Sequence, residues 1–194
     1  MFNINDYPFD TQHNYLEIGG EAMIFHCHHY MMNLQRTILD ADYIESEVFL
    51  IGSAADAVYN QLKNLCNGLS VDDSKAMIQE VYKTFGYGLI DISLMDEKGI
   101  ELTTNKSFFS QTWVLKFGKS SQTIDYYTSG FLAAAYAVLY NKELKNIYAS
   151  QTKCIAMGDE YNHFSIHESE CNFAIYPPKK AIEFKSVQKV SLNW

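Results

Sequence analysis

Four consecutive residues near the start of the chain, His26-Cys27-His28-His29, carry the side chains best suited to chemistry. On the strand that the alternating pattern predicts here, His26 and His28 point to one face, and Cys27 and His29 point to the other. Two imidazoles on one face can hold a divalent metal or act as acid and base near neutral pH. A third metal ligand would have to come from Glu21, Asp91, Glu101 or His163.

Three interpretations of His26 and His28 stay open at this point. They are satisfied histidines of the core or of an interface, they contact a ligand or act in catalysis, or they bind a metal. A nucleophilic Cys27 would need a neighbouring histidine to lower its pKa, and on a strand its two neighbours face away from it. We therefore expect Cys27, like Cys66, to pack as a small apolar group. His163 and His167, on a later strand, are expected on a solvated face.

The elements that position these residues follow from the periodicity of the apolar positions. A strand is predicted over 21–29, and helical spacing follows it until about residue 40. Helices are predicted over 48–66 and over 70–85, the second with Ser70 as its N-cap. After them we expect a hairpin of 89–95 with 100–104, a helix over 108–117 that Gly118 stops, a helix capped by Thr123 or Asp125, and a second hairpin of 146–157 with 161–167. This order indicates an α+β fold, with an antiparallel sheet packed against several helices.

Length and composition bound the remaining possibilities. A chain of 194 residues, 47% hydrophobic and 14% aromatic, is expected to form a single globular domain over 1–194, with an irregular N-terminal arm over 1–20 and an extended C-terminal tail over 169–194. The net charge of −8 and the absence of a basic stripe argue against nucleic-acid binding. No apolar run approaches the roughly 20 residues of a spanning helix, no secretory signal opens the chain, and the four cysteines are widely spaced. We therefore expect a cytoplasmic protein without membrane insertion.

Several short motifs follow one another between residues 107 and 167. They are the run from Trp113 to Gly118, Tyr127-Thr128-Ser129-Gly130-Phe131 at the start of a small-residue helix, Lys142-Glu143-Leu144, and Cys154-Ile155-Ala156-Met157-Gly158-Asp159. In this order and spacing the segment resembles the 4-vinyl reductase domain family. The resemblance implies an α+β ligand-binding fold related to phenol-sensing regulator domains and to transport-particle subunits. It also implies a small apolar or aromatic ligand held inside the domain, and a homodimer.

Many members of that family carry a structural zinc, and the resemblance places its four ligand positions on Thr128, Gln151, Cys154 and Asn162. Only Cys154 has kept a side chain of the ligand type, whereas zinc needs about four nitrogen, sulfur or carboxylate donors. We therefore expect the family zinc site to be lost, no cofactor to be bound, and a hydrogen-bonded polar cluster to take the place of the metal. A divalent metal at His26 and His28 remains the alternative. The haem of related sensors is excluded because no histidine occurs between Tyr30 and Asn162.

Aromatic residues are densest between 108 and 131, where the resemblance places the ligand cavity. The residues expected to contact the ligand are Phe108, Trp113, Tyr126, Tyr127 and Phe131, and for each one ordinary core packing is the alternative. Tyr126, Tyr127 or a neutral His26 would bind a hydroxyl or carbonyl group of the ligand. The sequence thus favours a stand-alone sensor or carrier of an apolar or aromatic molecule. The alternatives are an enzyme that uses His26 and His28 for acid–base or metal-assisted chemistry, and a scaffold subunit. No Gly-x-Gly-x-x-Gly dinucleotide motif occurs.

Overall fold

The computed structural model describes residues 9–10 and 15–175. Residues 1–8 and 11–14 of the arm predicted over 1–20, and residues 176–194 of the tail predicted over 169–194, therefore lie outside the described residues. In chain order the elements are β1 Phe9–Asp10, β2 Tyr15–Ile18, β3 Glu21–Met23, α1 His28–Leu39, α2 Ser46–Leu65, α3 Val71–Thr84, β4 Ile100–Thr104, α4 Phe108–Phe117, α5 Tyr126–Leu139, η2 Leu144–Asn146, β5 Ile147–Lys153, η3 Ile155–Met157 and β6 Asn162–Glu168. This is the α+β class that the sequence predicts, and the prediction is confirmed.

The central sheet is antiparallel, in the order β4-β6-β5. Leu102 of β4 pairs with Phe164 of β6, and Ile166 of β6 pairs with Ala149 of β5. Side chains alternate along β6, so that Phe164 and Ile166 are buried while His163 before them and His167 after them are half-exposed. His163 and His167 therefore lie on the outer face, as the sequence predicts.

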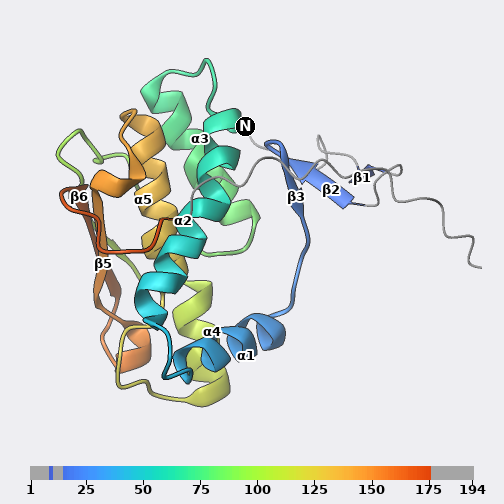
Figure 1. Cartoon of the computed structure of the whole chain (residues 1–194), viewed down its shortest axis with the longest axis vertical. Helices are drawn as coiled ribbons and strands as arrows, with labels where there is room; N and C mark the ends of the chain where they lie inside the picture. Colours follow the sequence, from blue (N-terminus) through green and yellow to red (C-terminus); the bar gives the residue numbers. More distant parts are fainter. Residues whose placement is uncertain (1–8, 11–14, 176–194) are drawn as a thin grey trace, which may run out of the picture.

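Helix α5 packs on the buried face of this sheet, and α2 packs on the other side of α5 (Figure 1). Nearly all residues of α5 are buried, which is the behaviour of a helix that is apolar on every side. The crossing with α2 is close because Gly130 has no side chain: a Cβ there would meet the Ile51 carbonyl oxygen and would lie 2.7 Å from the Cβ of Ala54. The small-residue helix recognised in the sequence is thus the central layer of the fold.

The three short strands β1, β2 and β3 form a second antiparallel sheet that stands beside the helices (Figure 1). Helix α2 holds this sheet by two side-chain amides: Gln61 donates to the carbonyl of Ile18 at 3.0 Å, and Asn64 donates to that of Gly19 at 2.8 Å. The arm over 1–20 was expected to be irregular, and this expectation is wrong where β1 and β2 form. A stretch without helix or strand, 24–27, leads from this sheet to α1.

The strand predicted over 21–29 is also wrong in its second half. Strand β3 ends at Met23, and His28 is already the first residue of α1. Cys27, with an extended backbone, is the N-cap residue, and its carbonyl accepts a hydrogen bond from the Met31 amide at 3.3 Å. The helix predicted from Tyr30 onward therefore begins at His28, two residues earlier. The alternating pattern that predicted a strand does not hold beyond Met23.

The first predicted hairpin is wrong as well, because residues 89–95 form no strand and β4 pairs with β6 instead. Side chains satisfy part of this backbone: Gln79 of α3 accepts from the amide of Ile92 at 2.9 Å, and Asp91 accepts from that of Ser93. The predicted helix over 70–85 is confirmed, with Ser70 as its cap. The helices that Asp125 opens and Gly118 ends are confirmed too. Among the described residues no helix is long and apolar enough to cross a membrane.

Candidate functional site

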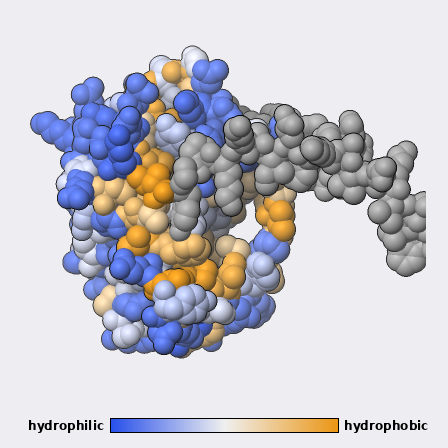
Figure 2. All heavy atoms as spheres, viewed as in Figure 1, coloured by the Kyte–Doolittle hydropathy of each residue, from blue (hydrophilic) through white to orange (hydrophobic). Residues whose placement is uncertain are grey.

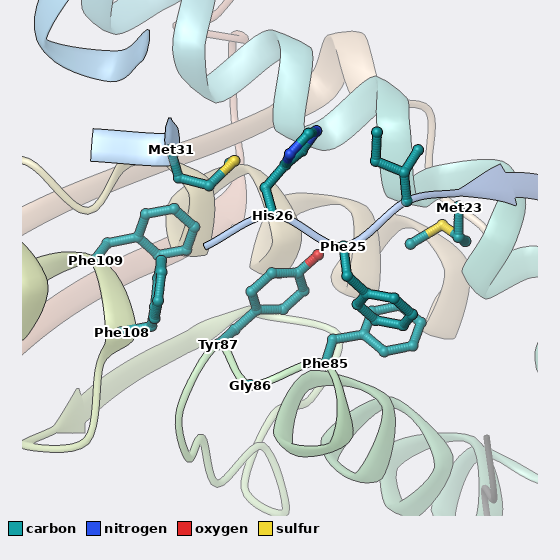
Figure 3. Close-up of a pocket in the computed structure, with 10 residues that line it drawn as sticks. Met23, Phe25, His26, Met31, Phe85, Gly86, Tyr87, Phe108 and Phe109 are labelled. Carbon is teal, nitrogen blue, oxygen red and sulfur yellow. The ribbon is translucent and has the colours of Figure 1, made fainter. Parts of the chain in front are cut away.

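A pocket of about 130 Å³ opens between three segments that are distant in the sequence (Figure 3). One wall is the connection from β3 to α1, residues 23–26, together with Met31 of α1. The opposite wall is the turn after α3, residues 85–87, and the first two residues of α4, Phe108 and Phe109. Apolar and aromatic side chains dominate this lining, and the polar groups among them belong to His26 and Tyr87.

Local backbone features position the wall formed by residues 85–87 and by the start of α4. Helix α3 ends at Thr84, and Gly86 follows it with a φ of 81°, a left-handed conformation that favours glycine and turns the chain towards the pocket. The carbonyl of Tyr87 then accepts a hydrogen bond from the amide of Phe108 at 2.8 Å. This bond ties the turn after α3 to the start of α4, where the Ser107 side chain caps the helix by accepting from the amide of Ser110.

The aromatic rings in and behind the pocket lining contact one another as one cluster. Phe108 meets Phe109 edge to face at 5.2 Å, and Phe109 stacks on Tyr127 at 5.0 Å. Tyr87 lies 4.5 Å from Tyr127, measured between ring centroids. Burial raises the pKa of Tyr87, and its hydrogen bond with the Tyr127 side chain acts in the opposite direction. The Tyr87 hydroxyl is therefore a neutral donor and acceptor at the pocket, as the recognition of a polar group on an apolar ligand requires.

The five residues expected to contact the ligand take different places. Phe108 lines the pocket, whereas Tyr127 and Phe131 lie behind its wall, Phe131 packing against Tyr82 with ring centroids 4.9 Å apart. Trp113 is buried next to Phe117 and under the guanidinium of Arg36. Tyr126 is also buried away from the pocket lining; its hydroxyl accepts from Gln122, and burial raises its pKa to about 12.

The histidine run is not arranged as a strand would arrange it. His26 lies in the connection, lines the pocket and stacks on Tyr30 with ring centroids 4.2 Å apart. His28 lies in the first turn of α1, with its ring 4.0 Å from that of His29. The charge of His28 lowers the pKa of His29. The two imidazoles expected on one face therefore belong to different elements, and His26 alone lines the pocket.

The two cysteines expected to pack as apolar groups also differ. Cys66 is buried, and burial raises its pKa. Cys27 is exposed at the start of α1, so the expectation of packing is wrong for it. The backbone amide of Tyr30 lowers the pKa of the Cys27 thiol, as expected for a sulfur at a helix N-terminus.

A buried polar cluster occupies the position that the resemblance assigns to zinc. At its centre the Asp125 carboxylate accepts from the Ser107 hydroxyl at 2.5 Å, from the Thr128 amide at 3.2 Å and from the Asn162 side chain at 3.3 Å. Gln151 accepts from the backbone amide of Asp125 at 2.9 Å. Thr128, Gln151 and Asn162 are thus joined through Asp125.

Cys154 reaches the same cluster through Ser110. The Ser110 hydroxyl lies 3.7 Å from the Cys154 sulfur and donates to the Asn162 side-chain oxygen at 3.0 Å. That oxygen also accepts from the amide of Ile155 at 2.9 Å. The cluster therefore joins the starts of α4 and α5 to the turn between β5 and β6.

These side chains do not fit a zinc ion, because Cys154 and Asp125 are the only donors of the metal-binding type among them and their partners are hydroxyl and amide groups. Within residues 9–10 and 15–175 no group of three or more histidine, cysteine, aspartate or glutamate side chains is placed to hold a metal. Burial raises the pKa of Asp125, while the bonds from Ser107 and Thr128 act against that shift.

Sequence reasoning missed two parts of this arrangement. Asp125 was expected only as a helix cap, although it is fully buried and central to the cluster. The wall made by Phe85, Gly86 and Tyr87 was missed because local patterns carry no information about which distant segment faces a loop. A glycine followed by an aromatic residue just after a helix was the available signal.

Comparison with known proteins identifies the fold. No family model and no curated protein matches the chain. Among solved structures, the phenol-responsive sensory domain of the transcription activator PoxR, determined with phenol, is similar over 84% of this chain and 85% of that chain, with a TM-score of 0.64 and 14% identity. A vinyl-4-reductase family protein from Methanocaldococcus jannaschii is similar over 78% of this chain and 87% of that chain, with a TM-score of 0.51 and 11% identity. At such identities the likeness establishes the fold, and it confirms at that level the resemblance stated for residues 107–167.

Proposed function

Since the chain has the fold of the phenol-responsive sensory domain and of the vinyl-4-reductase family protein, we propose that it binds a small apolar or aromatic molecule in the pocket between residues 23–26, 85–87 and 108–109, as a sensor or carrier. The observation that carries this proposal is the lining of that pocket. It combines aromatic and aliphatic side chains with two polar groups, those of His26 and Tyr87. Such a lining is typical of sites that bind small apolar ligands and orient them by a few hydrogen bonds.

The size of the pocket supports a single-ring ligand. Its volume of about 130 Å³ is close to the ~150 Å³ of an engineered apolar cavity that takes up benzene. The fold neighbour determined with phenol agrees with that size. A hydroxyl group on the ring would find Tyr87 as its partner, because this hydroxyl lies at the pocket and keeps its proton at neutral pH.

Calorimetric titration of the whole chain with phenol tests the proposal. We expect one molecule bound per chain, and no binding after Met31→Trp, which fills the pocket from α1. Leu94→Trp is the matched control, since Leu94 is 86% exposed between α3 and β4 and does not line the pocket. Absence of heat with phenol, toluene and indole alike would refute the proposal, as would equal binding by the Met31 variant.

A second candidate, an enzyme that works on such a ligand, rests on the position of His26 in the pocket lining. His28, which was to complete a catalytic pair, lies in α1 next to His29. Acid–base chemistry here would therefore depend on His26 and Tyr87. Turnover of a bound aromatic compound that His26→Gln abolishes, without loss of binding, would establish this function, and binding without turnover favours the sensor or carrier.

We also propose a homodimer in the cytoplasm. The outer faces of α1 and α4, two helices that pack together, expose Tyr30, Leu34, Val114 and Leu115, and exposed apolar side chains of this kind often mark protein contacts. All four cysteines are free thiols, which is typical of a reducing compartment. Light scattering during gel filtration measures the oligomeric state, and a monomeric mass at every protein concentration tested would refute the dimer.

A further inference from the structure

The connection between β3 and α1 forms one wall of the pocket and yet exposes its apolar side chains. Ile24 is 66% exposed and Phe25 is 60% exposed, although both line the pocket. In Figure 3 the connection crosses the pocket, with the Tyr87 hydroxyl pointing towards it. Figure 2 shows hydrophobic residues both on this connection and on the part of the body across the gap from it. Apolar surface on both sides of an opening favours closure, because closure removes it from water.

Hydrogen bonds hold both ends of the connection, whereas Ile24 and Phe25 between them form none with other described residues. At the β3 end, the Gln61 side chain donates to the sulfur of Met23 at 3.3 Å. At the α1 end, the carbonyl of Cys27 accepts a hydrogen bond of the first helical turn. Between these points no hydrogen bond joins Ile24 or Phe25 to any other described residue. A short segment fixed at both ends and unbonded between them can move as a flap.

The opposite wall is fixed by its own bonds. The amide of Tyr87 donates to the carbonyl of Tyr82 at 3.2 Å, and the carbonyl of Tyr87 accepts from the amide of Phe108 at 2.8 Å. Tyr82 in turn is fully buried, and its hydroxyl is hydrogen-bonded to that of Thr128 at 2.6 Å. A change in the width of the pocket therefore has to come from the connection rather than from this wall.

We propose that residues 24–27 are a lid that closes on the bound ligand through Ile24 and Phe25, and that this closure carries the signal of binding to the β1–β2–β3 sheet. This inference rests on the proposed function and adds its regulation. Along the chain this connection joins the sheet to α1, and the side chains of Gln61 and Asn64 hold the sheet to α2. A ligand that contacts the lid only when it is closed binds the closed state more tightly and so shifts the population towards it.

The exposed thiol of Cys27, at the fixed end of the lid on the N-cap of α1, reports whether the closed lid covers it. Cys66 and Cys154 are buried, and the half-buried Cys171 can be removed by Cys171→Ser. In the whole chain carrying that substitution, we expect saturating phenol to slow the alkylation of Cys27 by N-ethylmaleimide about fivefold, as a shift from a mostly open to a mostly closed lid would. The buried thiols stay unreactive and serve as internal controls.

A pair of variants separates the lid from the rest of the pocket. Phe25→Ser removes the larger apolar side chain of the lid, and we expect it to weaken phenol binding on the order of tenfold, which corresponds to about 1.4 kcal/mol of lost apolar contact. Leu94→Ser removes an exposed apolar side chain that lies outside both the pocket and the exposed faces of α1 and α4, and it is expected to leave the affinity unchanged.

The outcomes distinguish the lid from the proposed function. Calorimetric binding of phenol with an unchanged rate of Cys27 alkylation overturns the lid and leaves the binding function standing. Equal weakening by Phe25→Ser and Leu94→Ser also overturns the lid. Absence of phenol binding in the unsubstituted chain overturns the proposed function, and the lid with it.

Discussion

Replacing Asp125 by alanine tests whether the hydrogen-bonded cluster around its carboxylate holds this part of the fold together. The carboxylate is fully buried and accepts bonds from the Ser107 hydroxyl, the Thr128 amide and the Asn162 side chain. Asn162 keeps its bond to Ser110 after the substitution. Ser107 and Thr128 each lose the acceptor of a buried bond.

The magnitude follows from those two donors. A buried polar group left without a partner costs roughly 1–3 kcal/mol, so the two together cost on the order of 4 kcal/mol. For a chain of this length, each kcal/mol lowers the melting temperature by about 2–4 °C. The expected loss for Asp125→Ala is therefore roughly 8–16 °C. Thermal unfolding followed by circular dichroism measures it.

The pH dependence gives an independent check with a definite sign. Burial holds the pKa of Asp125 above its ordinary value, so the folded chain binds this proton more tightly than the unfolded chain. The contribution of Asp125 to the free energy of unfolding therefore falls as the pH rises through the interval between the ordinary and the raised pKa. Asp125→Asn removes this pH dependence and, since its side chain can still accept from Thr128, is expected to lie between the unsubstituted chain and the alanine variant in stability.

The control is Asp56→Ala, at an exposed position of α2, for which a change within about 0.5 kcal/mol is expected. A loss below 1 kcal/mol for Asp125→Ala, or equal losses for both alanine variants, would refute the role assigned to the cluster.

Three further outcomes follow from the described contacts. Gly130→Ala is expected to destabilise the fold by about 3 kcal/mol, because the new methyl group would overpack against α2. Gly68→Ala, at a position with open space and a φ of 80°, is expected to cost about 1 kcal/mol of backbone strain. Urea titration measures the free energy of unfolding of both variants. Tyr87→Phe is expected to weaken phenol binding roughly two- to tenfold and to leave toluene binding unchanged, and equal effects on both ligands would contradict the hydrogen bond. Asn172→Ala removes two bonds to the β5 backbone at Ala149, and faster hydrogen exchange of that amide, with about 1–2 kcal/mol of lost stability, is the expected result.

Local patterns predicted the parts of the fold that depend on neighbouring residues. The caps at Ser70 and Asp125 and the stop at Gly118 all lie where the sequence places them, because each is a bond or a conformation within one turn of helix. The partner of β4 could not be found in this way. The turn at Asp96 and Gly99 does form, but β4 pairs with β6, some sixty residues later, and the packing that selects this partner is not visible in either segment alone.

In the candidate site, too, local features could be predicted from the sequence and long-range contacts could not. Its aromatic content near Phe108 was predicted from composition and from the family resemblance. The pocket itself depends on how the connection at 24–27 crosses the turn at 85–87, and no periodicity encodes such a crossing. His26 lines this pocket, but the strand that the sequence predicted would have placed it on one face together with His28.

The most direct measurement of ligand binding in this pocket uses the methionine methyl groups as reporters. In a chain labelled with ¹³C-methyl methionine and titrated with phenol, the methyl resonances of Met23 and Met31, which line the pocket, are expected to shift together and to show contacts with the protons of the phenol ring. The resonance of Met95, buried elsewhere in the core, is expected to stay in place. Saturating phenol that leaves Met23 and Met31 unshifted, or that shifts Met95 instead, would contradict the pocket as the site of binding.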